Sequence, residues 1–483
     1  MRKGWMVLLA MALVVALAVP ASAEMKLNGF YRVKPTMSNL IGAGNISANV
    51  PGMETAAATS LVKESGSGSG IDTARSRNFT EMRNRLRFEI GDENVKGVTF
   101  FELDGNFGDT GGTVGRNQGF AANGDSINLE TKNAYVWFKV PDTGLSFTVG
   151  LQGYLDEFGG LLFGYSDQAG VVANFKLEPV ALRLTWLKIR DNVTSSTTAD
   201  TTINFKWSNN PPGDSDADYY ALDAKFAPAK DVQVTGHFGF LRDSGSWIGQ
   251  PTEAAALEIL KAYYLGANAT FNAGPAKVTG FFLYNFGTFE DDGGTAADVK
   301  IAGYAARLRA DAKLGPGNAF LEGLYVSGDD DTSSTTKYKS VIVGSDFAAL
   351  TSYYFSPDLL ILFPNLDMIN SAAALTLSPS NSGRGVILLA AGYSQKFSDK
   401  VSGKLGLGYL AADKKRKSST STEAKGKDMG TEINANVNYN ITKGLDFGVY
   451  GAYCMLGGFY DRAAGEKNPD DLYDLHARLN YAF

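Results

Sequence analysis

The sequence predicts an all-β fold: a transmembrane, antiparallel up-and-down β-barrel of about 18 strands, with about 16 as the alternative count. Three observations predict it. Segments of about ten residues alternate strictly between apolar and polar side chains. Short turns and long polar connections follow one another along the chain. The chain ends on an alternating segment rich in aromatic residues.

The alternation is clearest in Glu432–Ile441, which reads EINANVNYNI. Its apolar residues share one parity, and its glutamate and asparagine residues share the other. Successive side chains of a strand point to opposite faces, so this segment has one apolar and one polar face. Val401–Tyr409 and Val232–Phe240 repeat the pattern. A row of asparagines suits water better than a packed core, so we expect the polar faces to line a wet interior.

The last residues, Asp471–Phe483, read DLYDLHARLNYAF and alternate in the same way. A terminal strand is normally the edge of a sheet, and unpaired edges invite aggregation. In hydrocarbon, each unpaired backbone group costs several kcal/mol. Pairing of this strand with the first predicted strand, Met25–Lys34, would close the ring and leave no edge.

The connections between the predicted strands alternate in length. Short turn signals rich in Gly, Pro, Asp or Asn lie near Gly91, Pro141, Glu178, Pro228, Ala273, Gly315, Ser398 and Thr442. Long polar stretches such as Asn192–Asp218 and Lys414–Asp428 lie between them. Short turns on one side and long loops on the other are typical of bacterial outer-membrane barrels, in which the short turns face the periplasm. The segment Val341–Phe363 is long enough to contain two further strands, which is left as an alternative.

Residues 1–23 are predicted to be a secretory signal peptide, which leaves residues 24–483 for the barrel. Arg2 and Lys3 precede the apolar run Trp5–Val19, and Ala21–Ala23 forms an A-x-A cleavage site. A membrane anchor is the alternative, but the run is shorter than the about 20 residues of a spanning helix.

Charge and cysteine content narrow the function classes. Two of the 45 Lys and Arg residues lie in the signal peptide, so 43 remain against 51 acidic residues, and the net charge falls from −6 to −8. An acidic chain is a poor nucleic-acid binder, so no nucleic-acid partner is expected. Cys454 is the only cysteine, which excludes an internal disulfide.

Taken together, the signal peptide, the alternation, the asymmetric connections and the C-terminal Leu-Asn-Tyr-Ala-Phe resemble Gram-negative outer-membrane porins. The segment Arg83–Asp109 resembles the second hairpin of porin-like channels, including alginate-export-like and delta-proteobacterial channel proteins. The resemblance implies a channel in the outer membrane, surrounded by lipid and lipopolysaccharide. It also implies that Phe483 is an assembly signal read by the barrel-assembly machinery, with a membrane-interface aromatic as the alternative role. It leaves a homotrimer open.

Rows of charged residues occupy the polar parity of two predicted strands. A lipid-facing arginine near the bilayer midplane costs roughly 2–4 kcal/mol, so these rows are expected to point into the lumen. The predicted pore-lining residues are Arg83, Arg85, Arg87, Glu102, Asp104, Asp223, Arg307, Arg309 and Asp311. One interpretation is that the arginines select anionic or carboxylate-bearing solutes through bidentate contacts. The other is that they pair with neighbouring carboxylates and brace the wall.

A glycine-rich segment, Leu155–Gly170, follows the fifth predicted strand and contains Leu161, Leu162, Phe163 and Tyr165. A fully solvated loop does not need such residues. We therefore expect it to fold inward and narrow the pore, with Asp156, Glu157 and Asp167 at the constriction. The alternative is packing on neighbouring elements or on a partner subunit. The segment Val341–Gly385 is a second inward loop, a lid or a missed hairpin.

Catalysis is not expected. His237 and His476 are the only histidines, and neither has neighbours at metal-ligand spacing. The chain has no G-x-S-x-G motif and no C-x-x-C-H haem-attachment motif. The sequence thus predicts no enzyme, no metal site and no cofactor.

The function expected from the sequence is that of a porin, a passive, water-filled channel for small hydrophilic solutes, with a preference for anions left open. Two alternatives belong to other classes. The barrel could be a sheath or scaffold for a periplasmic or extracellular partner such as a multihaem cytochrome. It could also be an exporter of an anionic polysaccharide, although mixed acidic and basic residues fit a strongly cationic conduit less well.

Replacing Phe483 with Ala should lower the yield of assembled protein in the outer membrane, because the resemblance makes this residue the assembly signal. The measurement is the amount of folded barrel in purified outer membranes. Normal insertion of the variant would contradict this role.

Overall fold

The computed structural model describes most of the chain in fifteen stretches. They are residues 24–39, 77–109, 120, 129–164, 166–190, 216–244, 259–290, 297–329, 336–347, 358–363, 375–376, 378–381, 383–415, 426–461 and 470–483. The predicted signal peptide lies outside them, as does Tyr165.

Strands make up almost all of the described secondary structure. They are β1 (Glu24–Ser38), β2 (Arg77–Gly91), β3 (Val95–Asn106), β4 (Glu130–Lys139), β5 (Leu145–Tyr154), β6 (Ser166–Leu177), β7 (Val180–Arg190), β8 (Ala217–Ala229), β9 (Val232–Asp243), β10 (Ile259–Ala273), β11 (Ala276–Glu290), β12 (Val299–Leu314), β13 (Gly317–Val326), β14 (Lys337–Tyr338), β15 (Val386–Lys396), β16 (Val401–Ala411), β17 (Asp428–Thr442), β18 (Leu445–Leu456) and β19 (Leu472–Ala482). Two short helices, α3 (Gly344–Phe347) and the 3-10 helix η2 (Gly458–Tyr460), complete the described elements.

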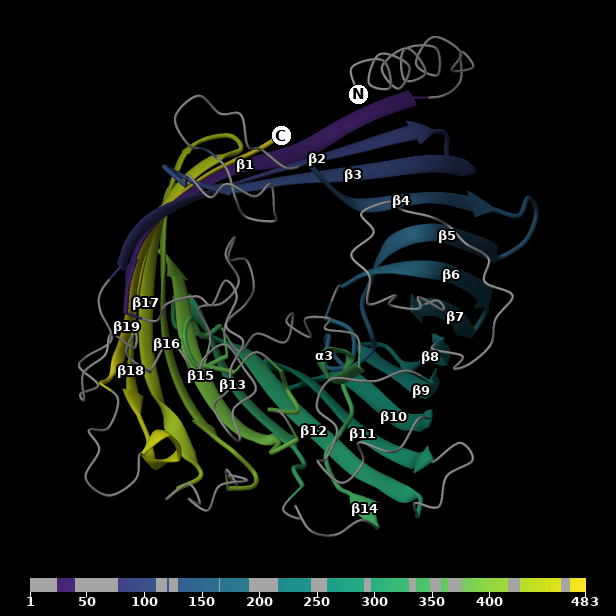
Figure 1. Ribbon diagram of the computed structural model, residues 1–483. Helices are drawn as coiled ribbons and strands as arrows, with labels where there is room; N and C mark the ends of the chain where they lie inside the picture. The colour runs from purple at the N-terminus through teal and green to yellow at the C-terminus, as the bar shows by residue number, and fades with distance from the viewer. Residues whose placement is uncertain are drawn as a thin grey trace, which may run out of the picture.

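The strands form one closed ring (Figure 1). Leaving aside the two-residue β14, 18 strands each pair antiparallel with their neighbours. The ring closes where β1 pairs with β19, from Phe30 opposite Ala482 to Ser38 opposite Asp474. Two backbone hydrogen bonds between Gly29 and Phe483, of 3.1 and 3.0 Å, extend this seam. The predicted barrel, its closure and its strand count of about 18 are confirmed.

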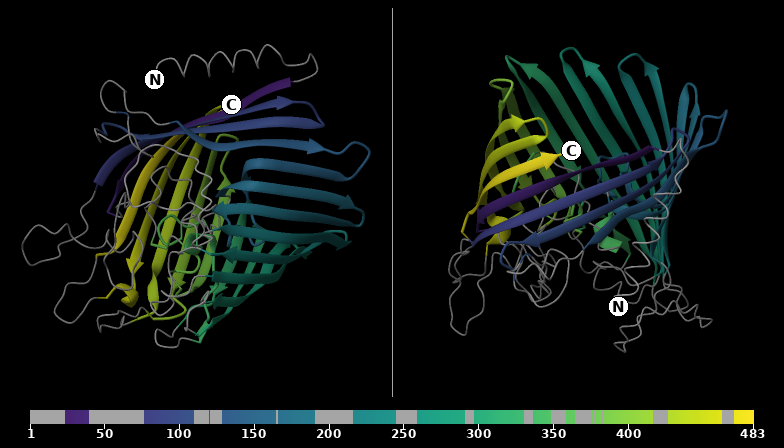
Figure 2. Two further views of the ribbon diagram at one scale, coloured as in Figure 1. Left: turned by 45° about the vertical axis from the view of Figure 1, so that its right-hand side comes forward. Right: turned by 90° about the horizontal axis from the view of Figure 1, so that it is seen from above.

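Figure 2 shows the strands side by side around the wall. The exposure of their residues follows the sequence alternation. On the outside, Leu321 and Leu405 are 64% and 60% exposed. On the inside, Glu432 and Asn434 are buried, although both are polar. The exposed apolar residues form the surface that a membrane would cover, and the polar face lines the lumen as predicted.

The connections also match the predicted asymmetry. Short turns join β2 to β3, β4 to β5, β6 to β7, β8 to β9, β10 to β11, β12 to β13, β15 to β16 and β17 to β18. Longer connections join the other pairs of consecutive barrel strands. Phe483 lies at the end of β19, 41% exposed, with its ring 5.9 Å from that of Tyr31.

Two sequence predictions about connections need correction. In the described part of Val341–Phe363, no barrel strand occurs, and the residues between β13 and β15 instead include β14 and α3. The two-residue β14 pairs parallel with β12, beyond the point where β13 ends. The loop after β5 is shorter than predicted because β6 already begins at Ser166 and pairs with β5 from there.

No helix among the described residues has the length and apolar character needed to cross a membrane.

An arginine should be tolerated on one face of the wall and not on the other. Leu405→Arg places a charge on the outer face and should destabilise the barrel by about 2–4 kcal/mol near the bilayer midplane. Asn436→Arg places it on the lumen face and should be tolerated. Urea unfolding in lipid vesicles measures both free energies. Equal losses would mean that the two faces are wrongly assigned.

Candidate functional site

The first charged wall of the lumen lies on β2 and β3. The guanidinium of Arg83 donates two hydrogen bonds to the carboxylate of Asp104, at 2.8 and 2.6 Å, in a bidentate pair. Arg83 also lies 3.3 Å from Glu102, and Arg85 donates to the same carboxylate. The structure therefore brings together four of the predicted residues, in the cross-strand pairs of the β2–β3 hairpin.

Access to water increases along this arginine row. The side chain of Arg83 is 6% exposed, that of Arg85 15% and that of Arg87 37%. Arg87 donates to the hydroxyl of Tyr135 at 3.1 Å and lies 3.4 Å from Glu89. Arg83 is placed to brace the wall, whereas Arg87 is the member of the row that water reaches most easily.

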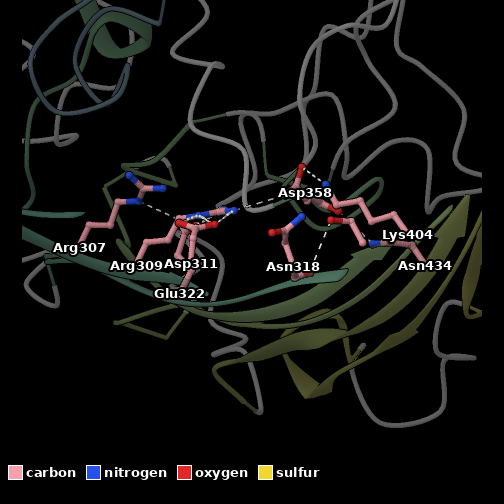
Figure 3. Close-up of polar contacts among 9 residues, drawn as sticks. Arg307, Arg309, Asp311, Asn318, Glu322, Asp358, Lys404 and Asn434 are labelled. Carbon is pink, nitrogen blue, oxygen red and sulfur yellow. Dashed lines mark hydrogen bonds and ion pairs between the residues drawn. The ribbon is translucent and has the colours of Figure 1, made fainter. Parts of the chain in front are cut away.

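The second charged wall lies on β12 and β13 (Figure 3). Arg307 and Arg309 donate to the two oxygens of Glu322, at 2.8 and 2.9 Å. Arg309 also donates to Asp311 at 2.8 Å. Glu322 was not predicted as a site residue, although its parity on β13 places it beside both arginines.

Residues 155–164, called the first inward loop, fold around a single carboxylate. Both oxygens of Asp156 accept backbone N–H groups, from Phe158 and Gly160 on one side and from Leu162 and Phe163 on the other, at 2.6–3.1 Å. Burial raises the pKa of Asp156, and the four N–H donors act in the opposite direction. Asp156 thus shapes the loop and does not face the pore water.

The first inward loop packs against the lumen wall. The ring of Phe158 lies 5.0 Å from His237 and 5.4 Å from Phe281. A Cβ added at Gly266 would lie 2.8 Å from Phe158, so only glycine permits this close approach. The apolar residues of the loop therefore pack on neighbouring strands, which was one of the two interpretations of the sequence.

Glu157 joins the loop to the wall by polar contacts. Its carboxylate lies 2.9 Å from Arg183 of β7, and its backbone oxygen accepts from Asn268 of β10 at 2.6 Å. Asp167 is not in the loop. It lies on β6, 2.8 Å from Lys132 and 2.9 Å from the side-chain amide of Asn133 on β4.

Asp223 on β8 belongs to a chain of buried polar groups behind the first inward loop. It accepts a hydrogen bond from Arg183 at 2.8 Å and lies 2.6 Å from Nδ1 of His237. The other ring nitrogen of His237 lies 3.1 Å from the hydroxyl of Tyr219. Asp223 is thus separated from the arginine row of β2 and serves a different part of the wall.

Residues 341–347 and 358–363, called the second inward segment, also lie inside the ring. The carbonyl of Ile342 accepts from Tyr264 at 3.1 Å, and its N–H donates to Asn285 at 3.0 Å. The two inward elements touch, because Gly344 N–H donates to the carbonyl of Leu162 at 2.9 Å. Figure 1 shows α3 within the ring. Of the three sequence interpretations of this region, the inward loop describes these residues.

A buried carboxyl group lies in α3. Burial raises the pKa of Asp346 to about 7, while hydrogen bonds from Val343 N–H and the Ser380 hydroxyl act in the opposite direction.

Glu432 of β17 holds the other half of the second inward segment. Its carboxylate accepts the N–H groups of Leu360, Ile361 and Leu362, at 2.7–2.9 Å. Such charge-assisted bonds are stronger than neutral ones. The parity of Glu432 predicted its place on the lumen face but not its role, because its partners lie about 70 residues away in a segment without periodicity.

Among the described residues, no group of three or more histidine, cysteine, aspartate or glutamate side chains is arranged to hold a metal ion.

Comparisons with known proteins identify the fold. No protein-family model matches the chain, and no curated protein sequence matches it. Solved structures do match. OccAB4 of Acinetobacter baumannii and the outer-membrane protein OpdK of Pseudomonas aeruginosa are each 12% identical, with a TM-score of 0.51, over 95% of this chain and 98% of theirs. OccK8 (OprE) of Pseudomonas aeruginosa is 11% identical with the same score and coverage. One OpdK structure was determined with vanillate. At this identity, the likeness shows the barrel fold alone.

Two arginines of one row should behave differently when they are removed. Arg83→Gln leaves the buried carboxylates of Asp104 and Glu102 poorly compensated and should lower the free energy of unfolding by about 3–5 kcal/mol. Arg87→Gln removes a partly exposed pair and should lower it by less than about 1 kcal/mol. Unfolding in detergent micelles, followed by circular dichroism, measures the difference. Similar losses for both variants would show that exposure does not separate bracing from accessible arginines.

Proposed function

We propose that the protein is a porin of the bacterial outer membrane, a passive channel through which small hydrophilic solutes diffuse. The observation that carries this proposal is the closed ring of 18 strands with charged side chains on its inner face. A ring of this size is wide enough to hold water. Several inner charges keep contact with solvent, among them Arg87 and Lys404, whose side chains are 37% and 27% exposed.

The partly exposed arginines of the wall, and not the net charge of the lining, would favour small anions. Arg85, Arg87, Arg307 and Arg309 line two parts of the wall, and arginine binds carboxylates well because its planar group presents paired donors. Vanillate, found with one similar structure, is itself a carboxylate, so small carboxylates are the first solutes to test. The two inward elements narrow the path, and Glu157 and Asp167 are the predicted acidic residues beside it, whereas Asp156 acts through the shape of the loop.

The proposal includes location and partners. The signal peptide of residues 1–23 would direct export, and the barrel-assembly machinery would recognise the C-terminal strand with Phe483. The exposed apolar residues of the outer face would contact lipid and lipopolysaccharide. A homotrimer is one arrangement that would bury part of this face. The finer resemblance of Arg83–Asp109 to alginate-export-like and delta-proteobacterial channels remains a prediction from sequence.

The alternative functions have less support. A sheath around a partner protein needs an open lumen, whereas the two inward elements occupy part of it and pack on its wall. A conduit for an anionic polysaccharide needs a mainly cationic lining, whereas the arginines here are paired with Glu102, Asp104, Asp311 and Glu322. No enzymatic function is proposed.

Single-channel recording in planar bilayers under a salt gradient tests the proposal. The protein should form stable pores, and the reversal potential should indicate preference for the anion. Replacing Arg85 and Arg87 together with Gln should lower the anion-over-cation permeability ratio by about twofold, because two fixed positive charges leave the lumen. A protein that inserts into bilayers without forming conducting pores would contradict the proposed function. An unchanged ratio in the variant would leave these arginines a bracing role only.

A further inference from the structure

Two cations on the lumen wall lie beside one aromatic ring. The guanidinium carbon of Arg309 lies 4.1 Å from the ring centre of Phe320, and Nζ of Lys404 lies 6.0 Å from it. Arg309 comes from β12, Phe320 from β13 and Lys404 from β16. The ring holds both cations from one side through cation–π attraction, which leaves their other sides for an anion.

That place is occupied by a carboxylate of the chain itself (Figure 3). One oxygen of Asp358 lies 2.5 Å from Nζ of Lys404, and the other lies 3.8 Å from Nη2 of Arg309. Asp358 belongs to the second inward segment and not to the barrel wall. A residue that reaches the wall from inside the lumen therefore bridges two wall cations, as a solute carboxylate would.

The backbone at Asp358 is fixed independently of its carboxylate. Asn434 donates to the carbonyl of Asp358 at 3.2 Å, and Glu432 holds the three N–H groups that follow Leu359. A Cβ added at Gly408 would lie 2.5 Å from Leu359, so this wall glycine makes room for the segment. Rotation of the Asp358 side chain could thus free both cations while the segment stays docked.

Lys404 depends more than Arg309 on the carboxylate of Asp358 for compensation of its charge. Arg309 has two further carboxylate partners, Glu322 at 2.9 Å and Asp311 at 2.8 Å. Lys404, in contrast, has one carboxylate within 4.0 Å among the residues that the structure describes, and that carboxylate belongs to Asp358. Water reaches the group, because the side chains of Asp358, Lys404 and Arg309 are 33%, 27% and 18% exposed.

We propose that Arg309, Lys404 and Phe320 form an anion-binding site in the lumen, and that Asp358 occupies it as an internal competitor. The inference rests on the proposed channel function and adds a site and its control to it. A transported carboxylate passes by exchanging with the Asp358 carboxylate. Such competition suits a channel, because a solute must bind well enough to enter and weakly enough to leave.

The test measures how single-channel conductance saturates with potassium acetate. In Asp358→Asn, the half-saturating concentration should fall about tenfold if Asp358 fills the site about nine tenths of the time, because the apparent affinity scales with the free fraction. Lys404→Gln should raise the half-saturating concentration. In the double variant with Asp358→Asn and Lys404→Gln, the roughly tenfold fall expected for Asp358→Asn alone should not appear. Lys404→Gln changes no residue of the second inward segment, whose backbone stays held by Asn434 and Glu432, so it tests the site even if Asp358→Asn folds poorly.

Asp446→Asn is the matched control. Asp446 lies 3.6 Å from Arg478 and its side chain is 34% exposed, so the charge change and the access to water are the same. An equal shift in Asp446→Asn would show that net lumen charge alone acts and would overturn the site. So would an unchanged value in Asp358→Asn that conducts normally.

The conductance of the wild-type protein tests the proposed channel function separately from the site. Wild-type protein that does not conduct contradicts the channel itself. In that case, binding of carbon-13-labelled acetate to the barrel in micelles, followed by nuclear magnetic resonance, still reports the site. Tighter acetate binding in Asp358→Asn than in wild type or Asp446→Asn supports the inference, and equal binding overturns it.

Discussion

Backbone hydrogen bonding within a membrane is the constraint on which the structure depends. An N–H or C=O group without a partner is costly in hydrocarbon, and a sheet satisfies all such groups only if it has no edges. The pairing of β1 with β19 meets this requirement. Once the ring is closed, alternation assigns each side chain to lipid or lumen, and so the positions of Arg83, Arg309 and Glu432 follow from parity.

Putting charges on the inner face creates a second requirement, that they be compensated. The narrow hairpin of β2 and β3 meets it with cross-strand pairs such as Arg83 with Asp104. Glu432 instead takes its donors from the backbone of the second inward segment. The same physical need is thus met by paired side chains in one part of the lumen wall and by the backbone of an inward chain segment in another. Arg87, whose side chain is 37% exposed, keeps contact with solvent.

The sequence predicts the barrel well because the information is local. Period-two alternation predicted the inward direction of Arg307 and Arg309, which lie on β12. Pairing with neighbouring carboxylates was one of two interpretations of the arginines, and the short turn between β2 and β3 brings Arg83 beside Asp104. The contacts of Asp358 could not be predicted in this way. Its segment has no periodicity, and its partners Arg309 and Lys404 become neighbours only after the ring has formed. Asp167 was wrongly predicted to lie in the loop after β5, because the glycine-rich sequence there did not indicate where β6 begins.

The pairing of the first strand with the last strand also determines when folding can be completed. The hydroxyl of Ser38 donates to the carbonyl of Tyr473, 435 residues further along the chain. Contacts between such distant positions form slowly, since a long loop must be closed before they contribute. Because β19 pairs with both β1 and β18, a chain without β19 would leave the edges of these two strands unpaired, and unpaired edges favour aggregation. A nascent chain of this design therefore needs protection from other chains throughout its passage to the membrane.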